Sequence, residues 1–174
     1  MQQAEEQLTV NSDPWTIYWQ QNRLDSCVST HAENDSRHIA GFWQVFADTL
    51  AEDASVLDLA TGNGSVPVAL LNAVPTLRIA AVDKADIAPA RFVRNQPLLG
   101  AVNFFPGVDL RALPFESGEF DAITSQFGIE YAPLEQACVQ LRVLRKHGAL
   151  AFLMHHSDSE VLQPVAAKLS EIAR

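Results

Sequence analysis

The segment from Ser55 to Leu71 constrains the fold of this chain more than any other. It opens with a nearly continuous apolar run, interrupted only by Asp58, that suits a strand buried on both faces. The turn Thr61-Gly62-Asn63-Gly64 follows, and apolar residues at helical spacing then indicate a helix, with Ser65 as its N-cap. A glycine turn that leads into a helix N-terminus presents unpaired backbone N–H groups to a ligand. The segment therefore predicts a ligand-binding strand–turn–helix unit.

A second landmark is Asp83, which ends the apolar run Leu77 to Val82 and lies 19 residues after Gly64. An acid at the tip of the second strand can accept both hydroxyls of a ribose, in dinucleotides or in S-adenosylmethionine. A dinucleotide site usually needs a third glycine, where this chain has Pro67. The spacing therefore favours an adenosyl ligand other than a dinucleotide.

Four segments, in order, resemble the class I S-adenosylmethionine-dependent methyltransferases. VLDLATGNG resembles motif I, with Ala60 in place of its first glycine, and AAVDKA resembles motif II. Residues 107–131 and 141–153 resemble two further blocks of the family. The resemblance covers roughly residues 36–156. It implies a three-layer αβα sandwich with a mostly parallel Rossmann-like sheet, to which this chain contributes five strands in the order 3-2-1-4-5.

The resemblance also implies which residues bind S-adenosylmethionine and release S-adenosylhomocysteine. Gly62 and Gly64 would face the methionine part, Asp83 the ribose, and Asp109 with Leu110 the adenine. The methyl group of Ala60 is expected to tighten the approach of the cofactor. The full candidate set is Asp58, Ala60, Thr61, Gly62, Asn63, Gly64, Asp83, Lys84, Asp109, Leu110, Ser125 and Gln126.

Residues near the predicted methyl acceptor are harder to assign, and the catalytic residue stays undetermined. The candidates are Glu130, Tyr131, His155 and His156. A histidine at the end of the fifth strand can act as a base, or it can merely cap the strand end. No third ligand at metal-binding spacing accompanies the two histidines. Arg37 either reaches the cofactor carboxylate or is a solvated charge, and the aromatic cluster at residues 14–19 is either a lid or a packed flap.

Composition limits the partners. The 174 residues carry a net charge of −9, which argues against nucleic acid and anionic membranes and favours a small-molecule acceptor. No apolar run approaches the roughly 18 residues of a membrane span. The first ten residues lack signal-peptide features, so a cytoplasmic protein is expected. Cys27 and Cys138 are expected to be reduced thiols.

The predicted organisation is an N-terminal lead, residues 1–35, followed by one domain, residues 36–174. Within it, we expect a helix from Ser36, a helix from Leu134 that stops at Gly148, a strand over residues 149–154 and a last helix over residues 158–173. The related sheets have seven strands, so the fifth strand here would form an uncovered apolar edge. This edge predicts a homo-oligomer, such as a dimer.

Three functions remain open from the sequence. The first is a methyltransferase acting on a small molecule of unknown identity. The second is a cofactor-binding or partner-binding protein without methyltransferase activity. The third is a nicotinamide-dependent oxidoreductase, against which the missing third glycine and Asp58 count.

Overall fold

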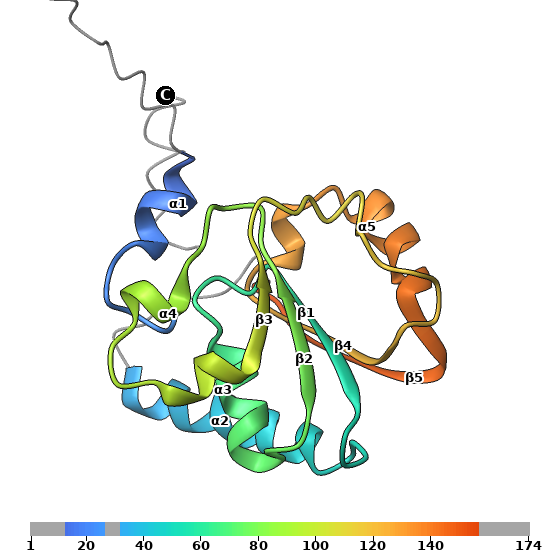
Figure 1. Ribbon diagram of the computed structural model, residues 1–174, viewed down its shortest axis with the longest axis horizontal. Helices are drawn as coiled ribbons and strands as arrows, with labels where there is room; N and C mark the ends of the chain where they lie inside the picture. Colours follow the sequence, from blue (N-terminus) through green and yellow to red (C-terminus); the bar gives the residue numbers. More distant parts are fainter. Residues whose placement is uncertain (1–12, 27–31, 157–174) are drawn as a thin grey trace, which may run out of the picture.

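The computed structural model describes residues 13–26 and 32–156, which fold around a five-stranded parallel sheet (Figure 1). The strands lie in the order β3-β2-β1-β4-β5, which confirms the predicted order. Their bounds are β1 Ser55–Leu59, β2 Arg78–Val82, β3 Val102–Phe105, β4 Phe120–Gln126 and β5 Leu144–Leu153. Because each neighbouring pair is parallel, all five carboxyl ends lie at one edge of the sheet.

Helices connect the strands and cover the sheet. The α-helices are α1 Pro14–Trp19, α2 Ala32–Ala47, α3 Ser65–Ala73, α4 Pro89–Phe92 and α5 Leu134–Gln140. Short 3₁₀ helices are η1 Pro97–Ala101, η2 Ile129–Tyr131 and η3 Leu141–Val143. The prolines at the start of α1, α4 and η1 suit first-turn positions, where no backbone donor is needed.

The core is divided between the two faces of the sheet. On one face, Trp43 of α2 and Leu70 of α3 pack against Val56 and Ile79. On the other face, Leu57 and Ile123 belong to a cluster that includes Ala137 of α5. Figure 1 shows α2 and α3 together on one side and α5 on the other. These two layers hold the carboxyl ends of the strands in fixed relative positions.

Several predicted boundaries are wrong for identifiable reasons. Helix α2 begins at Ala32, four residues before Ser36, and α3 is capped by the left-handed backbone of Gly64 (φ +85°) instead of the Ser65 side chain. The helix expected to stop at Gly148 ends at Gln140, because β5 already pairs with β4 from Leu144 onward. The predicted last helix lies outside the described residues.

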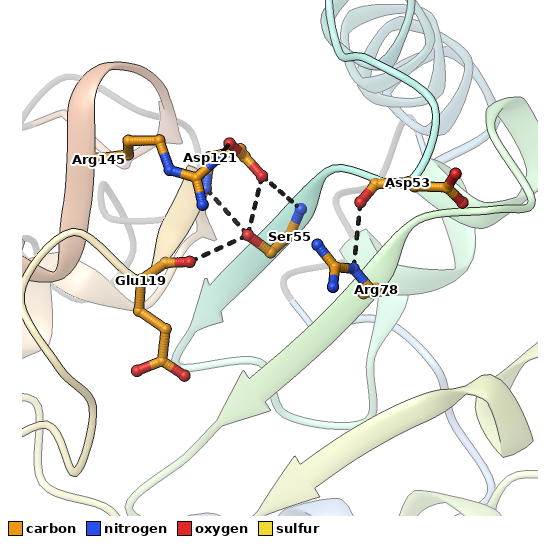
Figure 2. Close-up of polar contacts among 6 residues, drawn as sticks. All are labelled: Asp53, Ser55, Arg78, Glu119, Asp121 and Arg145. Carbon is orange, nitrogen blue, oxygen red and sulfur yellow. Dashed lines mark hydrogen bonds and ion pairs between the residues drawn. The ribbon is translucent and has the colours of Figure 1, made fainter.

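A polar network fixes the amino ends of the strands, opposite the edge described below (Figure 2). The Ser55 amide donates to Asp121 Oδ2 at 2.9 Å, and Arg145 pairs with the other carboxylate oxygen. Arg78 Nε donates to the Asp53 carbonyl at 3.1 Å. These contacts join β1 to β4 and β5, and β2 to the turn before β1, so they set the strand register. No helix within residues 13–26 and 32–156 combines the length and the apolar character needed to cross a bilayer.

Candidate functional site

The carboxyl ends of the strands surround a cavity of about 650 Å³. This edge is where open parallel sheets bind ligands, and the volume falls in the range of small-molecule pockets. Its walls come from the loops after β1 to β4 and from α1. The lining residues discussed below are Trp15, Trp19, Ala60, Thr61, Asp83, Lys84, Ala85, Asp109, Leu110, Arg111, Gln126, Phe127, Gly128 and Tyr131.

Asp83 joins the glycine turn to the loop after β2. The Gly62 amide donates to Asp83 Oδ2 at 2.8 Å, and the Ala85 amide donates to Oδ1 at 2.9 Å. Burial raises the pKa of Asp83, and these two backbone hydrogen bonds oppose that rise. Each carboxylate oxygen keeps further acceptor capacity, so this side chain at the cavity wall can still accept ribose hydroxyls. The residues present therefore fit an adenosyl ligand at this end of the cavity.

The glycine turn is held in a left-handed backbone conformation. Gly62 and Gly64 have φ values of +53° and +85°, and Ala60 adopts +53° despite its β-carbon. The Ala60 methyl group faces Gly128 after β4, where an added β-carbon would overlap it. The motif thus accommodates alanine because position 128 is glycine.

Asp58 lies beneath the cavity wall and does not line it. Its side chain is 1% exposed, and Oδ1 accepts a hydrogen bond from Thr124 Oγ1 at 2.7 Å. Burial raises the pKa of Asp58 to about 7, although the Thr124 hydrogen bond opposes the rise. The structure therefore gives Asp58 an internal contact between β1 and β4.

The predicted adenine end contains an ion-pair cluster. Asp109 accepts from Arg111 Nη2 at 2.7 Å and lies 3.6 Å from Lys84 Nζ. The Arg111 hydrogen bonds lower the pKa of Asp109. Leu110 is buried beside this cluster and lines the cavity. Sequence reasoning identified Asp109, Leu110 and Lys84 but missed Arg111, whose position two residues after Asp109 was the available signal.

The other predicted cofactor residues divide between the cavity and the structure behind it. Thr61 and Gln126 line the cavity, and Gln126 Oε1 also accepts from Trp43 Nε1 at 2.6 Å. Ser125 is buried, where its hydroxyl donates to the Leu59 carbonyl at 2.8 Å. Gly64 does not line the cavity and packs near Phe104.

Asn63 connects the glycine turn to the N-terminal segment. Its side chain is fully buried, and Nδ2 donates to the carbonyls of Trp19 and Arg23 at 2.9 and 2.8 Å. The Trp19 ring consequently lies directly against Gly62. Asn63 therefore contributes to the site indirectly, by holding α1 over the turn.

Four aromatic side chains, Trp15, Trp19, Phe127 and Tyr131, form what we call the aromatic wall of the cavity. Trp15 stacks on Trp19, with ring centroids 6.3 Å apart, and meets Tyr131 edge to face at 5.7 Å. The aromatic cluster at residues 14–19 therefore contributes two side chains to the cavity wall, and its role as a lid or as a packed flap stays a prediction. Arg37 is exposed on α2 and is not among the lining residues.

Two of the catalytic candidates contact each other. His155 Nδ1 lies 3.0 Å from Glu130 Oε1, and both side chains are largely buried. Neither lines the cavity, whereas Tyr131 does and His156 is exposed. The candidates are thus brought to the same edge of the sheet in different environments.

Comparison with known proteins gives a family match over the core of the chain. Residues 56–148 match the family described as "Methyltransferase domain". A demethylmenaquinone methyltransferase from Thermus thermophilus is 37% identical over 100 residues, which cover 56% of this chain and 46% of the relative. A mitochondrial 2-methoxy-6-polyprenyl-1,4-benzoquinol methylase from Caenorhabditis elegans is 26% identical over 119 residues, covering 65% of this chain and 42% of the relative. The chain thus spans less than half the length of these relatives.

A solved structure has the same fold. The YcgJ protein from Bacillus subtilis superposes with a TM-score of 0.61 at 22% identity, over 78% of this chain and 58% of that protein. At this identity the likeness concerns the fold. It places the sheet order described above within a known architecture.

Proposed function

Because the chain belongs to the class I S-adenosylmethionine-dependent methyltransferase family, we propose that it transfers a methyl group to a small aromatic acceptor of the phenol or quinol type. The observation that carries the proposal is the cavity at the carboxyl edge, which combines Asp83 with the aromatic wall. The family match counts against the nicotinamide-dependent alternative.

The cofactor would occupy the end of the cavity near the glycine turn. When bound, S-adenosylmethionine supplies a methyl group already activated by a sulfonium. Asp83 would accept the ribose hydroxyls, and Leu110 with Ala85 would offer apolar contacts to the adenine. The main tasks of the chain are then to position the acceptor and to exclude water.

The acceptor class follows from the aromatic wall and from charge. Aromatic rings recognise a planar ring by stacking and edge contacts. The cationic lining residues, Lys84 and Arg111, both contact Asp109, which reduces the positive charge that they present to an acceptor carboxylate or phosphate. The names of two relatives, which refer to demethylmenaquinone and to a benzoquinol, support the same acceptor class.

A transfer assay tests this proposal. The protein is incubated with S-adenosylmethionine labelled in the methyl group and with 1,4-naphthoquinol, and the organic extract is counted. We expect labelled product with the quinol and none with sarcosine, an aliphatic amino acid. Binding of S-adenosylhomocysteine without transfer to any phenol or quinol would instead favour a binding protein without methyltransferase activity.

A further inference from the structure

A buried histidine–glutamate pair lies next to the aromatic wall and has no role in the function proposed above. His155 lies two residues after the end of β5, and Glu130 lies in η2. Glu130 Oε1 accepts from the His155 backbone amide at 3.1 Å and lies 3.0 Å from His155 Nδ1. The side chains are 6% and 16% exposed. One carboxylate oxygen therefore holds both the backbone and the ring of His155.

This contact indicates which nitrogen of the ring carries a proton. An ionised carboxylate can only accept hydrogen bonds, so Nδ1 must carry a proton to bind Glu130. In the neutral imidazole, Nε2 then bears the free electron pair. Nε2 is buried and has no hydrogen-bond partner among the described residues. A buried basic nitrogen without a hydrogen-bond partner lowers the stability of the fold unless a ligand forms a hydrogen bond with it.

Phe127 links this pair to the cavity. Its ring stacks on His155, with centroids 4.4 Å apart and planes 26° from parallel, and it lines the cavity. Gly128 and Tyr131, which lie two residues before and one residue after Glu130, also line the cavity. Phe127 has a φ of +53°, which is unusual for a bulky residue, and its backbone amide donates a hydrogen bond to the Leu153 carbonyl at 2.8 Å. The imidazole thus lies directly behind Phe127, one of the four rings of the aromatic wall.

We propose that Glu130 and His155 form a proton-accepting pair for a hydroxyl-bearing acceptor. The acceptor reaches His155 Nε2 when the Phe127 ring moves away from the imidazole. This inference rests on the proposed function and deepens it. The acceptor O–H bond breaks, its proton moves to Nε2, and the electron pair stays on the acceptor oxygen. Glu130 stabilises the resulting imidazolium. The acceptor thereby becomes the stronger nucleophile that methyl transfer requires.

The test reads the histidine ring directly. In full-length protein labelled with ¹⁵N-histidine, the His155 resonances are identified by their loss in His155→Gln. We expect a neutral ring protonated at Nδ1, and a shift of the Nε2 signal when S-adenosylhomocysteine and 4-nitrophenol are added. Glu130→Gln keeps an oxygen for the backbone amide but removes the charge, so the preference for the Nδ1-protonated ring should weaken. His38→Gln, on the exposed surface of α2, should leave the His155 signals unchanged.

A second readout follows proton transfer itself. The phenolate absorbance of 4-nitrophenol should increase on binding to the wild type and should not increase on binding to Glu130→Gln or His155→Gln. Where the protein methylates 1,4-naphthoquinol, loss of the base should lower kcat about 100-fold with little change in S-adenosylhomocysteine affinity. Phe127→Ala, which removes the stacked ring, should increase the phenolate signal.

The outcomes separate the two proposals. A His155 ring protonated at Nε2 in the free protein would overturn the pair as a base, whatever the cofactor does. Binding of S-adenosylhomocysteine with no response of His155 or of the phenol absorbance would also overturn it, while leaving the proposed cofactor site intact. Absence of S-adenosylhomocysteine binding would contradict the proposed function. The nitrogen of the His155 ring that carries the proton would still show whether the pair can act as a base.

Discussion

The methyl group of Ala60 faces the α-carbon of Gly128, and a β-carbon at position 128 would overlap it. The two residues follow neighbouring strands, β1 and β4, and both line the cavity. Gly128 has a φ of −141°, outside the left-handed region that favours glycine, so its lack of a side chain matters for space. Ala60 stands where motif I usually has glycine, and the absence of a side chain at Gly128 leaves room for its methyl group.

This pair makes a double-mutant prediction. Gly128→Ala should destabilise the protein by about 1–3 kcal/mol because the two methyl groups collide. Ala60→Gly removes one methyl and relieves the positive φ, so its own effect should stay within about 1 kcal/mol of the wild type. The double variant should recover most of the loss, as measured by urea unfolding. Gly100→Ala, where a β-carbon meets nothing within 4 Å, is the control. Equal damage from Gly128→Ala in both backgrounds would rule out the compensation.

Asn63 gives a prediction about the N-terminal helix. Its side-chain amide donates to the carbonyls of Trp19, the last residue of α1, and of Arg23. Asn63→Ala should therefore lower the free energy of unfolding by about 1–3 kcal/mol and loosen residues 14–23. Asn63→Asp should be worse, because it places acceptor oxygens against two carbonyls. Hydrogen–deuterium exchange of this segment is the measurement, and Asn72→Ala, at an exposed position of α3, is the control. Unchanged exchange in both Asn63 variants would show that α1 is held by other contacts.

Asp58 makes stability depend on pH. Its folded pKa of about 7 lies above the ordinary value of 3.8, so the folded state retains a proton that the unfolded state loses. This contribution is complete below about pH 4 and is lost as the pH rises through about 7. Relative to Asp58→Asn, the wild type should lose about 1 kcal/mol of unfolding free energy per pH unit in this window. Urea unfolding between about pH 4 and 8 measures it, with Asp48→Asn as a surface control. Parallel pH profiles of wild type and Asp58→Asn would contradict the assignment.

Local patterns in the sequence were sufficient to predict the strand–turn–helix unit, whereas the sheet order was implied by the family resemblance. The apolar runs that end in Leu59 and Val82 become neighbouring strands, and Asp83 lies at the cavity as expected. The predicted start of β5 was wrong because the residues that follow Leu144 at its beginning, Arg145 to Gly148, are polar or small. Their strand conformation depends on pairing with β4 and on the Asp121 contact, which no local pattern reveals.

Contacts between distant residues account for what the sequence left open at the site. The Asn63 bonds to Trp19 and Arg23 span about 40 residues of sequence, and the Glu130–His155 contact joins η2 to the end of β5. Self-association stays a prediction. Within the described part of the chain β5 is an edge strand, and Leu150 and Met154, the residue after β5, are exposed there.

Whether Asp83 anchors an adenosyl cofactor is tested most directly by calorimetric titration with S-adenosylhomocysteine. We expect one site in the wild type and an affinity about 10- to 100-fold lower in Asp83→Asn, as for the loss of a hydrogen bond to a charged group. Asp86→Asn, the same charge change at an exposed position three residues away, should bind as the wild type does. No binding by the wild type, or equal binding by wild type and Asp83→Asn, would contradict the account.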